Sequence, residues 1–405
     1  MKAQVSAELS CPPTCFGAVP KGAVVEFSLP QAHSRPSSIA PAPDGDLWFT
    51  EIATGRIGRI TPAGSITEFS VPALAGLCEP TTGLPCTIAA GPDGNMWFTG
   101  GRQIGRITPA GEVTSHGLAS GPNSGAYAIT AGSDGNVWFT QPGESEIGRI
   151  TPAGEITEFA LPAPPFVPFV VTPPPDEPED LTLGKDGALW FTAVSGQGHS
   201  VGRITMTGAL NFFSNTPKPL AAIVAGPDGN TWFSNAGGRG AGRLTPSGAV
   251  RQFPTAIVIR ALTAGPDKNV WGYAGGEITR IAPDGSTTGF TTETSKTSPA
   301  GDPENEGPYA IAAGHDGNLW YANTAGNRIA RVHVAALPGA SPSRCVVPRL
   351  IGKTLNAARK SLARAHCRLG AVRHTGTAKG NHVASQRPAP GARLRPHGAV
   401  EVRVR

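Results

Sequence analysis

Residues 88–99 read IAAGPDGNMWFT, and residues 147–159 read IGRITPAGEITEF. These two patterns alternate along the chain, and consecutive tryptophans in the first pattern are 39 to 52 residues apart, a spacing typical of repeat architectures. All seven tryptophans of the chain share this place: Trp48, Trp97, Trp138, Trp190, Trp232, Trp271 and Trp320. An aliphatic residue stands nine positions before each of them: Ile39, Ile88, Ile129, Leu181, Ile223, Leu262 and Ile311.

The first pattern predicts a β-hairpin with a tight turn. Asp-Gly pairs supply the positive φ that such turns need, and six units carry one: Asp44-Gly45, Asp93-Gly94, Asp134-Gly135, Asp186-Gly187, Asp228-Gly229 and Asp316-Gly317. The second pattern alternates apolar and polar residues around a Pro-x-Gly turn, which predicts two more strands. Four short antiparallel strands in each of seven units predict an all-β fold, a seven-bladed β-propeller. The tryptophans then form the core between blades, in preference to a ligand-stacking role.

The two ends of the repeat region are complementary. The seventh unit ends at residues 329–332 without its last strand, whereas residues 24–30 (VVEFSLP) are that strand standing alone before the first unit. We expect this N-terminal strand to complete the last blade and close the ring, which covers a sheet edge. Connections between units vary in length, the longest being 162–180 and 291–309, and together they mark the predicted functional face.

Composition agrees with a turn-rich β protein. The 405 residues include 53 Gly and 40 Pro, and only 16% are charged, which argues against a helical bundle. No stretch approaches the roughly 20 apolar residues of a membrane-spanning helix. Residues 345–405 carry thirteen Lys or Arg and one acid, Glu401, a net charge of +12 within a total of +5. This division indicates two modules and an anionic partner for the tail, with solvated surface charge as the alternative.

The six cysteines fall into three close pairs: Cys11/Cys15, Cys78/Cys86 and Cys345/Cys367. The even number and the absence of a Cys-x2-Cys spacing favour disulfides over a metal site and indicate an oxidising compartment. We expect Cys78–Cys86 and Cys345–Cys367 disulfides and leave the pairing of Cys11 and Cys15 open, while a reactive thiol at Cys86 is the minor alternative. Residues 1–20 contain no apolar run of signal-peptide length, so a misplaced gene start, unusual export and a removed signal all remain open.

The units GPDGNMWFT, IGRITPAG and ITEFALP resemble the virginiamycin B lyase family over about residues 24–334. The resemblance implies a seven-bladed propeller, and an enzyme that opens cyclic streptogramin B antibiotics at an ester by elimination. It also implies magnesium, a His general base and acidic residues near the metal. These repeated motifs are structural, however, and say little about chemistry.

The family's functional positions are occupied differently in this chain. The last-blade Glu-Pro-His corresponds to residues 307–309, a second acid to residue 324, the sixth-blade Pro-His to residues 259–260 and the first-blade Pro-Tyr to residues 36–37. The residues here are Gly307, Pro308, Tyr309, Thr324, Ile259, Arg260, Pro36 and Ser37. Elimination needs a positioned base and a metal or acid on the leaving side, so the sequence argues against the same lyase activity.

One residue two positions before each aliphatic is expected at the channel mouth: Ser37, Cys86, Tyr127, Glu179, Ala221, Arg260 and Tyr309. Two tyrosines can stack on sugar or peptide groups, and Arg260 and Glu179 offer opposite charges. We therefore predict ligand binding by Ser37, Tyr127, Glu179, Arg260 and Tyr309. The alternative is a solvated channel in which the charges neutralise each other or face water.

The tail resembles a PASTA domain. It begins VVPRLIGKT at residue 346, continues with Leu355, Ala358, Leu362 and Ala365 at helical spacing, and ends in the strand pattern VEVRV at residues 400–404. Such domains occur outside bacterial cells and recognise or position against cell-wall material, and here Cys345 and Cys367 would tether the strand before the helix to the end of the helix.

The predicted organisation is an N-terminal segment (1–23), a propeller (24–334), a linker (335–344) and an α+β PASTA-like domain (345–405). The predicted function is an exported bacterial binding protein, extracellular or wall-associated, with a small-molecule, peptide or glycan ligand on the propeller and peptidoglycan or an anionic wall polymer on the tail. We expect a monomer without metal, cofactor, nucleic acid or membrane span. The alternative is a streptogramin B lyase-type enzyme or another carbon–oxygen lyase with a rearranged site, for which Glu51, Glu179 and Tyr309 are the candidates.

Overall fold

The computed structural model divides the chain into two compact units, Met1–Val334 and Ala335–Arg405. It describes residues 16–18, 20, 23–71, 86–118, 125–162, 177–195, 198–213, 220–235, 240–255, 258–274, 277–292, 310–337, 347–364, 368–374, 381–390, 392 and 399–404.

The described part of the first unit contains seven sheets, each with a core of four antiparallel strands. The first three sheets consist of β3 (Pro36–Pro41), β4 (Leu47–Glu51), β5 (Arg56–Ile60) and β6 (Ile66–Ser70); β7 (Ile88–Ala90), β8 (Met96–Gly100), β9 (Gln103–Ile107) and β10 (Val113–Gly117); and β11 (Ile129–Ala131), β12 (Val137–Gln141), β13 (Glu146–Ile150) and β14 (Ile156–Ala160). The fourth and fifth consist of β15 (Glu177–Leu183), β16 (Leu189–Ser195), β17 (Gly198–Ile204) and β18 (Leu210–Phe213); and β19 (Leu220–Ala225), β20 (Thr231–Asn235), β21 (Gly240–Leu244) and β22 (Val250–Pro254).

The last two sheets also take strands from the N-terminal region. The sixth consists of β23 (Ala261–Ala264), β24 (Val270–Ala274), β25 (Glu277–Ile281), β26 (Thr287–Thr291) and, at its outer edge, β1 (Phe16–Ala18). The seventh consists of β27 (Ile311–Ala313), β28 (Leu319–Asn323), β29 (Arg328–Val332) and β2 (Val24–Ser28).

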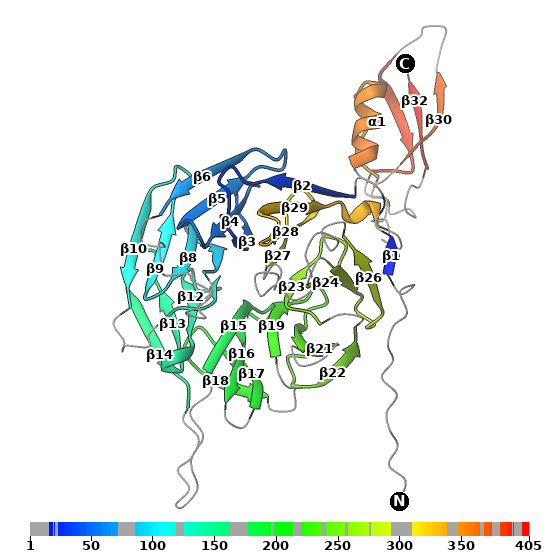
Figure 1. Ribbon diagram of the computed structural model, residues 1–405. Helices are drawn as coiled ribbons and strands as arrows, with labels where there is room; N and C mark the ends of the chain where they lie inside the picture. Colours follow the sequence, from blue (N-terminus) through cyan, green and yellow to red (C-terminus); the bar gives the residue numbers. More distant parts are fainter. Residues whose placement is uncertain are drawn as a thin grey trace, which may run out of the picture. The chain divides into compact units, whose positions relative to one another are not determined.

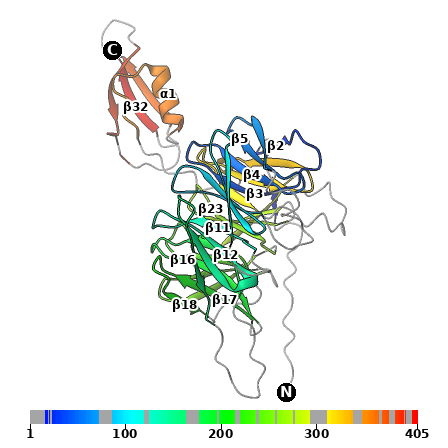
Figure 2. The ribbon, with the colours of Figure 1, turned by 90° about the vertical axis from the view of Figure 1, so that its left-hand side faces the viewer.

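The sheets follow one another around a ring, as in a β-propeller (Figure 1). The first strand of each sheet contacts the first strand of the next, and β27 contacts β3 in the same way. The side view shows the third and fourth sheets as neighbours, where β11 and β12 contact β15 (Figure 2). The predicted all-β propeller is therefore confirmed as a fold type.

The predicted N-terminal closure is also present. Strand β2 pairs antiparallel with β29, with Val24 opposite Val332 and Ser28 opposite Arg328. The parallel pairing of β1 with β26 was not predicted. The repeat pattern offered no sign of it, because β1 has no counterpart in the other units.

The turns that follow the first and third strands of a sheet lie on one side of the ring, which we call the turn face. It holds the Asp-Gly turns between the first and second strands and the Pro-x-Gly turns between the third and fourth. The glycines of the six Asp-Gly turns have φ between 76° and 98°, as the sequence predicts. The opposite side, where the first strands begin and the second strands end, is called the loop face.

A Trp-Asp-Arg group recurs on the turn face. In the third sheet, the Trp138 Nε1 donates to Asp134 Oδ1 at 3.1 Å, and the Arg149 guanidinium lies over the Trp138 ring at 5.6 Å. The Phe159 ring stacks on the Trp138 ring, with the two ring centroids 5.2 Å apart. Burial raises the pKa of Asp134, but hydrogen bonds from Asn136 and Trp138 outweigh burial and hold that pKa below its usual value.

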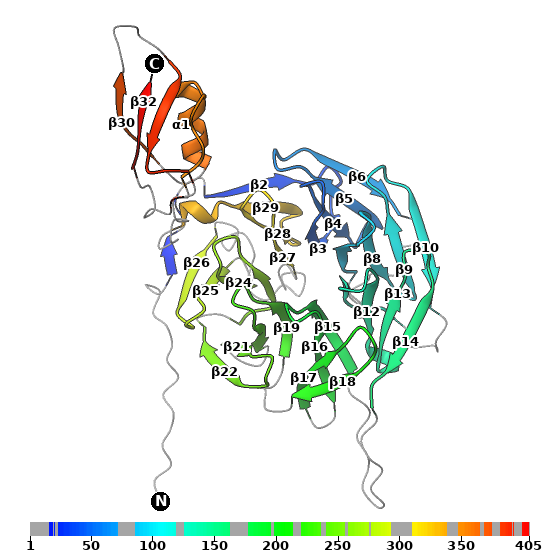
Figure 3. The ribbon, with the colours of Figure 1, turned by 180° about the vertical axis from the view of Figure 1, so that it is seen from behind.

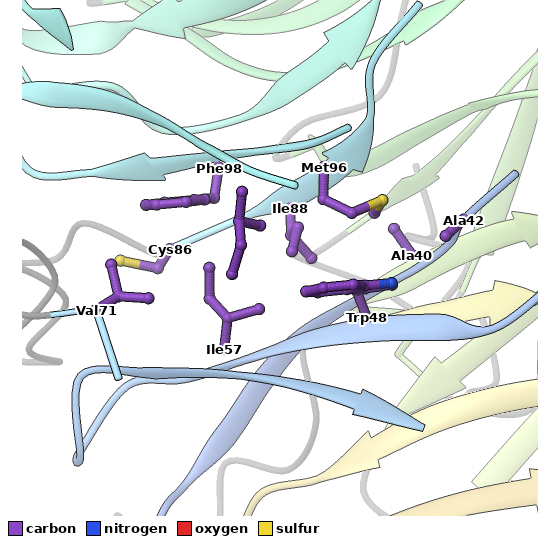
Figure 4. Close-up of a cluster of buried hydrophobic side chains, with 10 residues drawn as sticks. Ala40, Ala42, Trp48, Ile57, Val71, Cys86, Ile88, Met96 and Phe98 are labelled. Carbon is purple, nitrogen blue, oxygen red and sulfur yellow. The ribbon is translucent and has the colours of Figure 1, made fainter. Parts of the chain in front are cut away.

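The core lies between adjacent sheets. All seven tryptophans are at most 1% exposed, which confirms their predicted core role. Between the first and second sheets, Trp48 and Ile57 pack against Ile88 and Met96 (Figure 4). The tryptophans therefore hold the ring together through contacts from sheet to sheet.

The second unit contains a helix and a three-stranded sheet (Figure 3). The elements are α1 (Leu355–Arg364), β30 (Arg368–His374), β31 (Val383–Arg387) and β32 (Ala399–Val404). Ala358 and Leu362 of the helix pack on Val400, Val402 and Val404, as the helical spacing predicts. No helix within the described ranges has the length and apolar character needed to cross a membrane.

Candidate functional site

The loop face brings together residues that are about 40 to 50 positions apart in the sequence. The expected channel-mouth residues stand at or just before the starts of the first strands, and those strands are neighbours around the ring. Six of the seven are described: Ser37, Cys86, Tyr127, Glu179, Ala221 and Arg260. Tyr309 lies outside the described residues, so its position stays a prediction.

Buried hydroxyl groups connect these positions from one sheet to the next. The Thr140 Oγ1, at the end of β12, donates to the carbonyl oxygen of Glu179 in the fourth sheet at 2.6 Å. The same oxygen accepts from the Ala128 N–H of its own sheet at 3.0 Å. Thr50 connects the first and second sheets in the same way, donating to the Cys86 carbonyl at 2.9 Å. Each such threonine fixes the backbone of a candidate residue in the neighbouring sheet.

The last two sheets depart from this arrangement. Tyr273 and Ala322 stand at the positions of these threonines, and Tyr273 stacks on Tyr321 with ring centroids 4.6 Å apart. Between the seventh and first sheets, the Thr324 Oγ1 donates to the Pro36 carbonyl oxygen at 2.6 Å. The ring-closing junction therefore uses a different hydroxyl, which binds the carbonyl oxygen one residue before Ser37.

The predicted ligand residues differ widely in exposure. Ser37 is only 3% exposed, whereas Arg260 is exposed. Tyr127 is partly buried and packs against the apolar cluster that contains Trp138 and Leu181. Their roles as ligand contacts stay predictions.

Glu179 is the described candidate whose acid–base properties change most. Burial, together with the neighbouring charges of Asp180 and Glu177, raises the pKa of Glu179 to about 7. Asp180 lies beside it and accepts hydrogen bonds from the N–H groups of Leu181 and Ile223, both at 2.9 Å. Burial nevertheless raises the pKa of Asp180 to about 6. Glu179 can therefore gain or lose a proton near neutral pH.

Glu51, at the end of β4, is a second buried carboxyl group on the loop face. It is 1% exposed, its Oε1 has no hydrogen-bond partner among the described residues, and its Oε2 accepts from Thr54 at 3.4 Å. Burial raises the pKa of Glu51. Nearby, Ser34 is fixed by Asn327, whose Oδ1 accepts from the Ser34 N–H at 2.8 Å. Glu51 thus lies at the junction where the ring closes.

Magnesium does not fit the position where the family resemblance places an acid. That position holds Thr324, whose hydroxyl donates a hydrogen bond to the Pro36 carbonyl oxygen. Within the described ranges, no group of three or more His, Cys, Asp or Glu side chains could hold a metal ion.

Two features of this site were missed at the level of sequence. Asp180 was adjacent to a named candidate, and this adjacency could have drawn attention to a coupled acid pair. The threonine that ends the repeated WFT motif was visible in several units but was assigned only to a strand. Its contact with a carbonyl in another sheet depends on how the sheets pack.

Only one of the six cysteines lies in the described part of the chain. Cys86 is 1% exposed and sits beside Val71 in the core between the first two sheets (Figure 4). None of the described cysteines is a free thiol. Cys11, Cys15, Cys78, Cys345 and Cys367 lie outside the described residues, so every disulfide pairing stays a prediction.

The described sheets define a β-propeller, and the second unit is a small α+β module. A model described as the virginiamycin B lyase family matches residues 17–180 and 169–303, more than half of the chain, and a PASTA domain model matches residues 346–405. The chain belongs to the virginiamycin B lyase family and carries a C-terminal PASTA domain.

Curated relatives match over limited segments. A virginiamycin B lyase of Nocardia farcinica is 31% identical over 177 residues, which is 41% of this chain and 57% of the relative. A virginiamycin B lyase of Bordetella parapertussis is 36% identical over 59 residues, 15% of this chain and 19% of the relative. The matches thus span less than two thirds of either relative.

Solved structures match over about three quarters of the chain. A streptogramin B lyase structure is 30% identical with a TM-score of 0.63, covering 76% of this chain and 96% of that chain. A catalytically inactive histidine-to-alanine variant of virginiamycin B lyase from Staphylococcus aureus, solved with quinupristin, is 29% identical with a TM-score of 0.64 and covers 76% and 98%.

Proposed function

We propose that this chain is an exported bacterial binding protein. Its seven-bladed β-propeller presents a ligand face, formed by Ser37, Tyr127, Glu179, Arg260 and Tyr309, and its PASTA domain associates with the cell wall. The main support is the combination of a lyase-family propeller with a PASTA domain. At the reactive positions of the propeller, Tyr309, Arg260 and Thr324 stand in place of the base and acids that the resemblance implies.

The properties of the loop face suit binding. Arg260 is exposed, Tyr127 is partly buried against apolar neighbours, and Glu179 is held through its backbone by Thr140. A site with an aromatic ring, a cation and an acid on a fixed backbone can take a peptide or glycan fragment of moderate polarity. Extracellular or wall-associated location is part of the proposal and rests on the PASTA domain.

The division of labour is tested with three proteins: the full chain, residues 1–340 and residues 345–405. We expect the full chain and residues 345–405 to bind purified wall sacculi, with binding that weakens as salt rises through physiological strength. Residues 1–340 are expected to bind sacculi more weakly. Equal binding by residues 1–340, or none by residues 345–405 at low salt, would contradict wall association through the tail.

The ligand face is tested with fragments released enzymatically from sacculi. We expect Arg260→Ala in the full chain to weaken fragment binding at least fivefold in calorimetry. The matched control is Lys185→Ala, which removes an exposed cation from the turn face. Equal affinities of the two variants would show that the loop face does not select the ligand.

A second candidate function is a carbon–oxygen lyase with a rearranged site. The observation that favours it is the Glu179 carboxyl, whose pKa of about 7 suits a general base at neutral pH. On the main proposal, the purified protein leaves a streptogramin B ring intact even when magnesium is supplied. Mass-spectrometric detection of the linearised product, and its loss on Glu179→Gln or Tyr309→Phe, would favour the lyase.

A further inference from the structure

The sheet of the second unit has one buried face and one open face. The helix α1 covers the first, where Val400 and Val402 lie at most 1% exposed against Ala358 and Leu362. Side chains alternate between faces along a strand, so Glu401 and Arg403 lie on the open face, and both are exposed.

Three arginines gather on this open face. The parallel register of β30 and β32 places Arg373 directly opposite Arg403, and the antiparallel register of β31 and β32 places Ser385 on the other side of Arg403. Two residues before Arg403 in β32, and on the same face, Glu401 is opposite Arg387 of β31. All five residues are exposed. We call this set the arginine face.

The one acid of residues 345–405, Glu401, is outnumbered by the three arginines of this face. Within the described ranges, Arg373, Arg387 and Arg403 form no ion pair or hydrogen bond through their guanidinium groups, not even with Glu401. Like charges directly opposite each other on neighbouring strands destabilise a sheet. An arginine cannot relieve this repulsion by losing its proton, because it stays charged at all physiological pH values. The Arg373–Arg403 pair therefore has no structural benefit among the described contacts.

An anion held between the two guanidinium groups would remove the repulsion. Neighbouring strands are roughly 4.8 Å apart, so two guanidinium groups from opposite positions can converge on the oxygens of a single phosphate group. Each guanidinium presents a planar fork of donors that matches phosphate oxygens, and the Ser385 hydroxyl adds a donor beside them.

We propose that the arginine face is a binding site for a linear polymer that carries phosphodiester groups, with one phosphate held by Arg373 and Arg403. This inference rests on the proposed wall association of the second unit and assigns the charge-dependent part of it to one surface. A uniform cloud of positive charge over the unit would bind the same polymer without preference for any surface.

The test uses the full chain and poly(glycerol phosphate) labelled for fluorescence anisotropy. The test variant is Arg373→Gln with Arg403→Gln. The matched control is Arg349→Gln with Arg359→Gln, which removes the same charge from two exposed arginines outside the sheet. At low salt we expect the test variant to bind at least tenfold more weakly than the unchanged chain, and the control to stay within threefold of it.

Three further measurements test whether the phosphate group is what binds and whether the substitutions affect folding. Inorganic phosphate at millimolar concentration should compete with the polymer, and poly-glutamate of equal length should bind at least fivefold more weakly. Because the substitutions remove a repulsion, the second unit of the test variant should melt no lower than that of the unchanged chain.

The proposal is overturned if the two double variants lose affinity equally, if neither loses affinity, or if the unchanged chain does not bind the phosphate polymer. Poly-glutamate binding as tight as the phosphate polymer, no competition by inorganic phosphate, or a lower melting temperature of the test variant would also overturn it. Failure of the wall proposal looks different, because the unchanged full chain then fails to bind sacculi at all.

Discussion

The two faces of the propeller are built from the same strands and behave in opposite ways. On the turn face, a buried Trp N–H is satisfied by a turn Asp from within its own sheet, as in Trp138 and Asp134, and the same contact recurs in six of the seven sheets within the described ranges. On the loop face, the Thr140 hydroxyl donates to the Glu179 carbonyl oxygen in the next sheet. The threonine at the same position of another sheet, Thr50, donates to a different residue, Cys86. The turn-face contact therefore repeats with the sequence motif, whereas the loop-face contact repeats in its hydroxyl donor and varies in the residue that is held.

The two faces also differ in how they hold charge. Burial raises the pKa of Asp186 on the turn face, but hydrogen bonds from Arg203 and Trp190 outweigh it and bring the pKa below its usual value. Among the residues that the structure describes, Glu179 on the loop face has no comparable set of donors, and burial raises its pKa to about 7. Negative charge is thus stabilised at Asp186 on the turn face and destabilised at Glu179 on the loop face, and perturbed pKa values are typical of functional sites.

The largest effect is expected from removal of β2, the strand that closes the ring by pairing with β29. A chain that starts at Ser34 lacks β2 and loses the Phe27 ring that stacks on Trp320. We expect its melting temperature to fall by at least about 10 °C, since each kcal/mol lost is worth about 2–4 °C even in a domain of about 150–250 residues. A chain that starts at residue 23 keeps β2 and loses only β1, and it should melt within a few degrees of the full chain. Equal melting of the Ser34 chain and the full chain would disprove closure by β2.

The second effect concerns the turn face alone. Asp134→Ala removes the acceptor for the buried Trp138 N–H and for two donors of Asn136, so we expect a loss of about 3 kcal/mol in the free energy of unfolding. The control is Asp44→Ala in the first sheet, where the turn Asp accepts from the Asp46 N–H. Urea denaturation should show a loss of about 1 kcal/mol for this control. Similar losses for the two variants would mean that the Trp contact contributes little.

The third effect concerns the loop face. Thr140→Val keeps the side-chain shape but leaves the Ala128 N–H and the Glu179 carbonyl without their hydroxyl partner, at an expected cost of about 1–2 kcal/mol. Thr114→Val, on the exposed side of the outer strand β10, is the control and should change stability by less than about 0.5 kcal/mol. If fragment binding survives Thr140→Val unchanged, the hydroxyl links serve only the fold.

The smallest effect is the response of stability to pH. Between the ordinary glutamate pKa and about 7, folded Glu179 keeps a proton that the unfolded chain has lost, so its contribution makes the free energy of unfolding fall as the pH rises through this window. Solvent screening at this partly exposed group reduces the change to about 1 kcal/mol. Glu179→Gln should remove it, whereas Glu155→Gln on the exposed turn face should not.

The turn-face aspartates provide the opposite sign. The lowered pKa of Asp186 means that its stabilising contribution is present above the ordinary aspartate pKa and is lost as the pH falls through the folded value. Denaturant titrations from pH 3 to pH 8 should therefore show a rise in stability at the acid end and a decline towards neutrality. A curve for Glu179→Gln that declines as steeply as that of the unchanged chain would assign the decline to another group.

The candidate site was only partly accessible from the sequence. The distance from the Trp motif placed Glu179 and Arg260 at the starts of the first strands, and the structure has them there. The same rule included Ser37, which is 3% exposed, because equal spacing fixes the position along a strand but not the depth of the side chain. The coupling of Glu179 to Asp180 also escaped notice, since it depends on burial that only packed sheets produce.

The sequence by itself determined the repeating part of this protein. Strand alternation, Asp-Gly turns, the buried tryptophans and the matching ends at β2 and β29 all follow from patterns that act within a few residues or repeat at a fixed spacing. The tertiary structure alone decided which hydroxyl holds which carbonyl, which acid is buried, and that β1 joins β26. The physical reason is that local backbone preferences and apolar spacing are properties of a short segment, whereas desolvation and contacts between sheets arise only when residues about 40 positions or more apart are packed together.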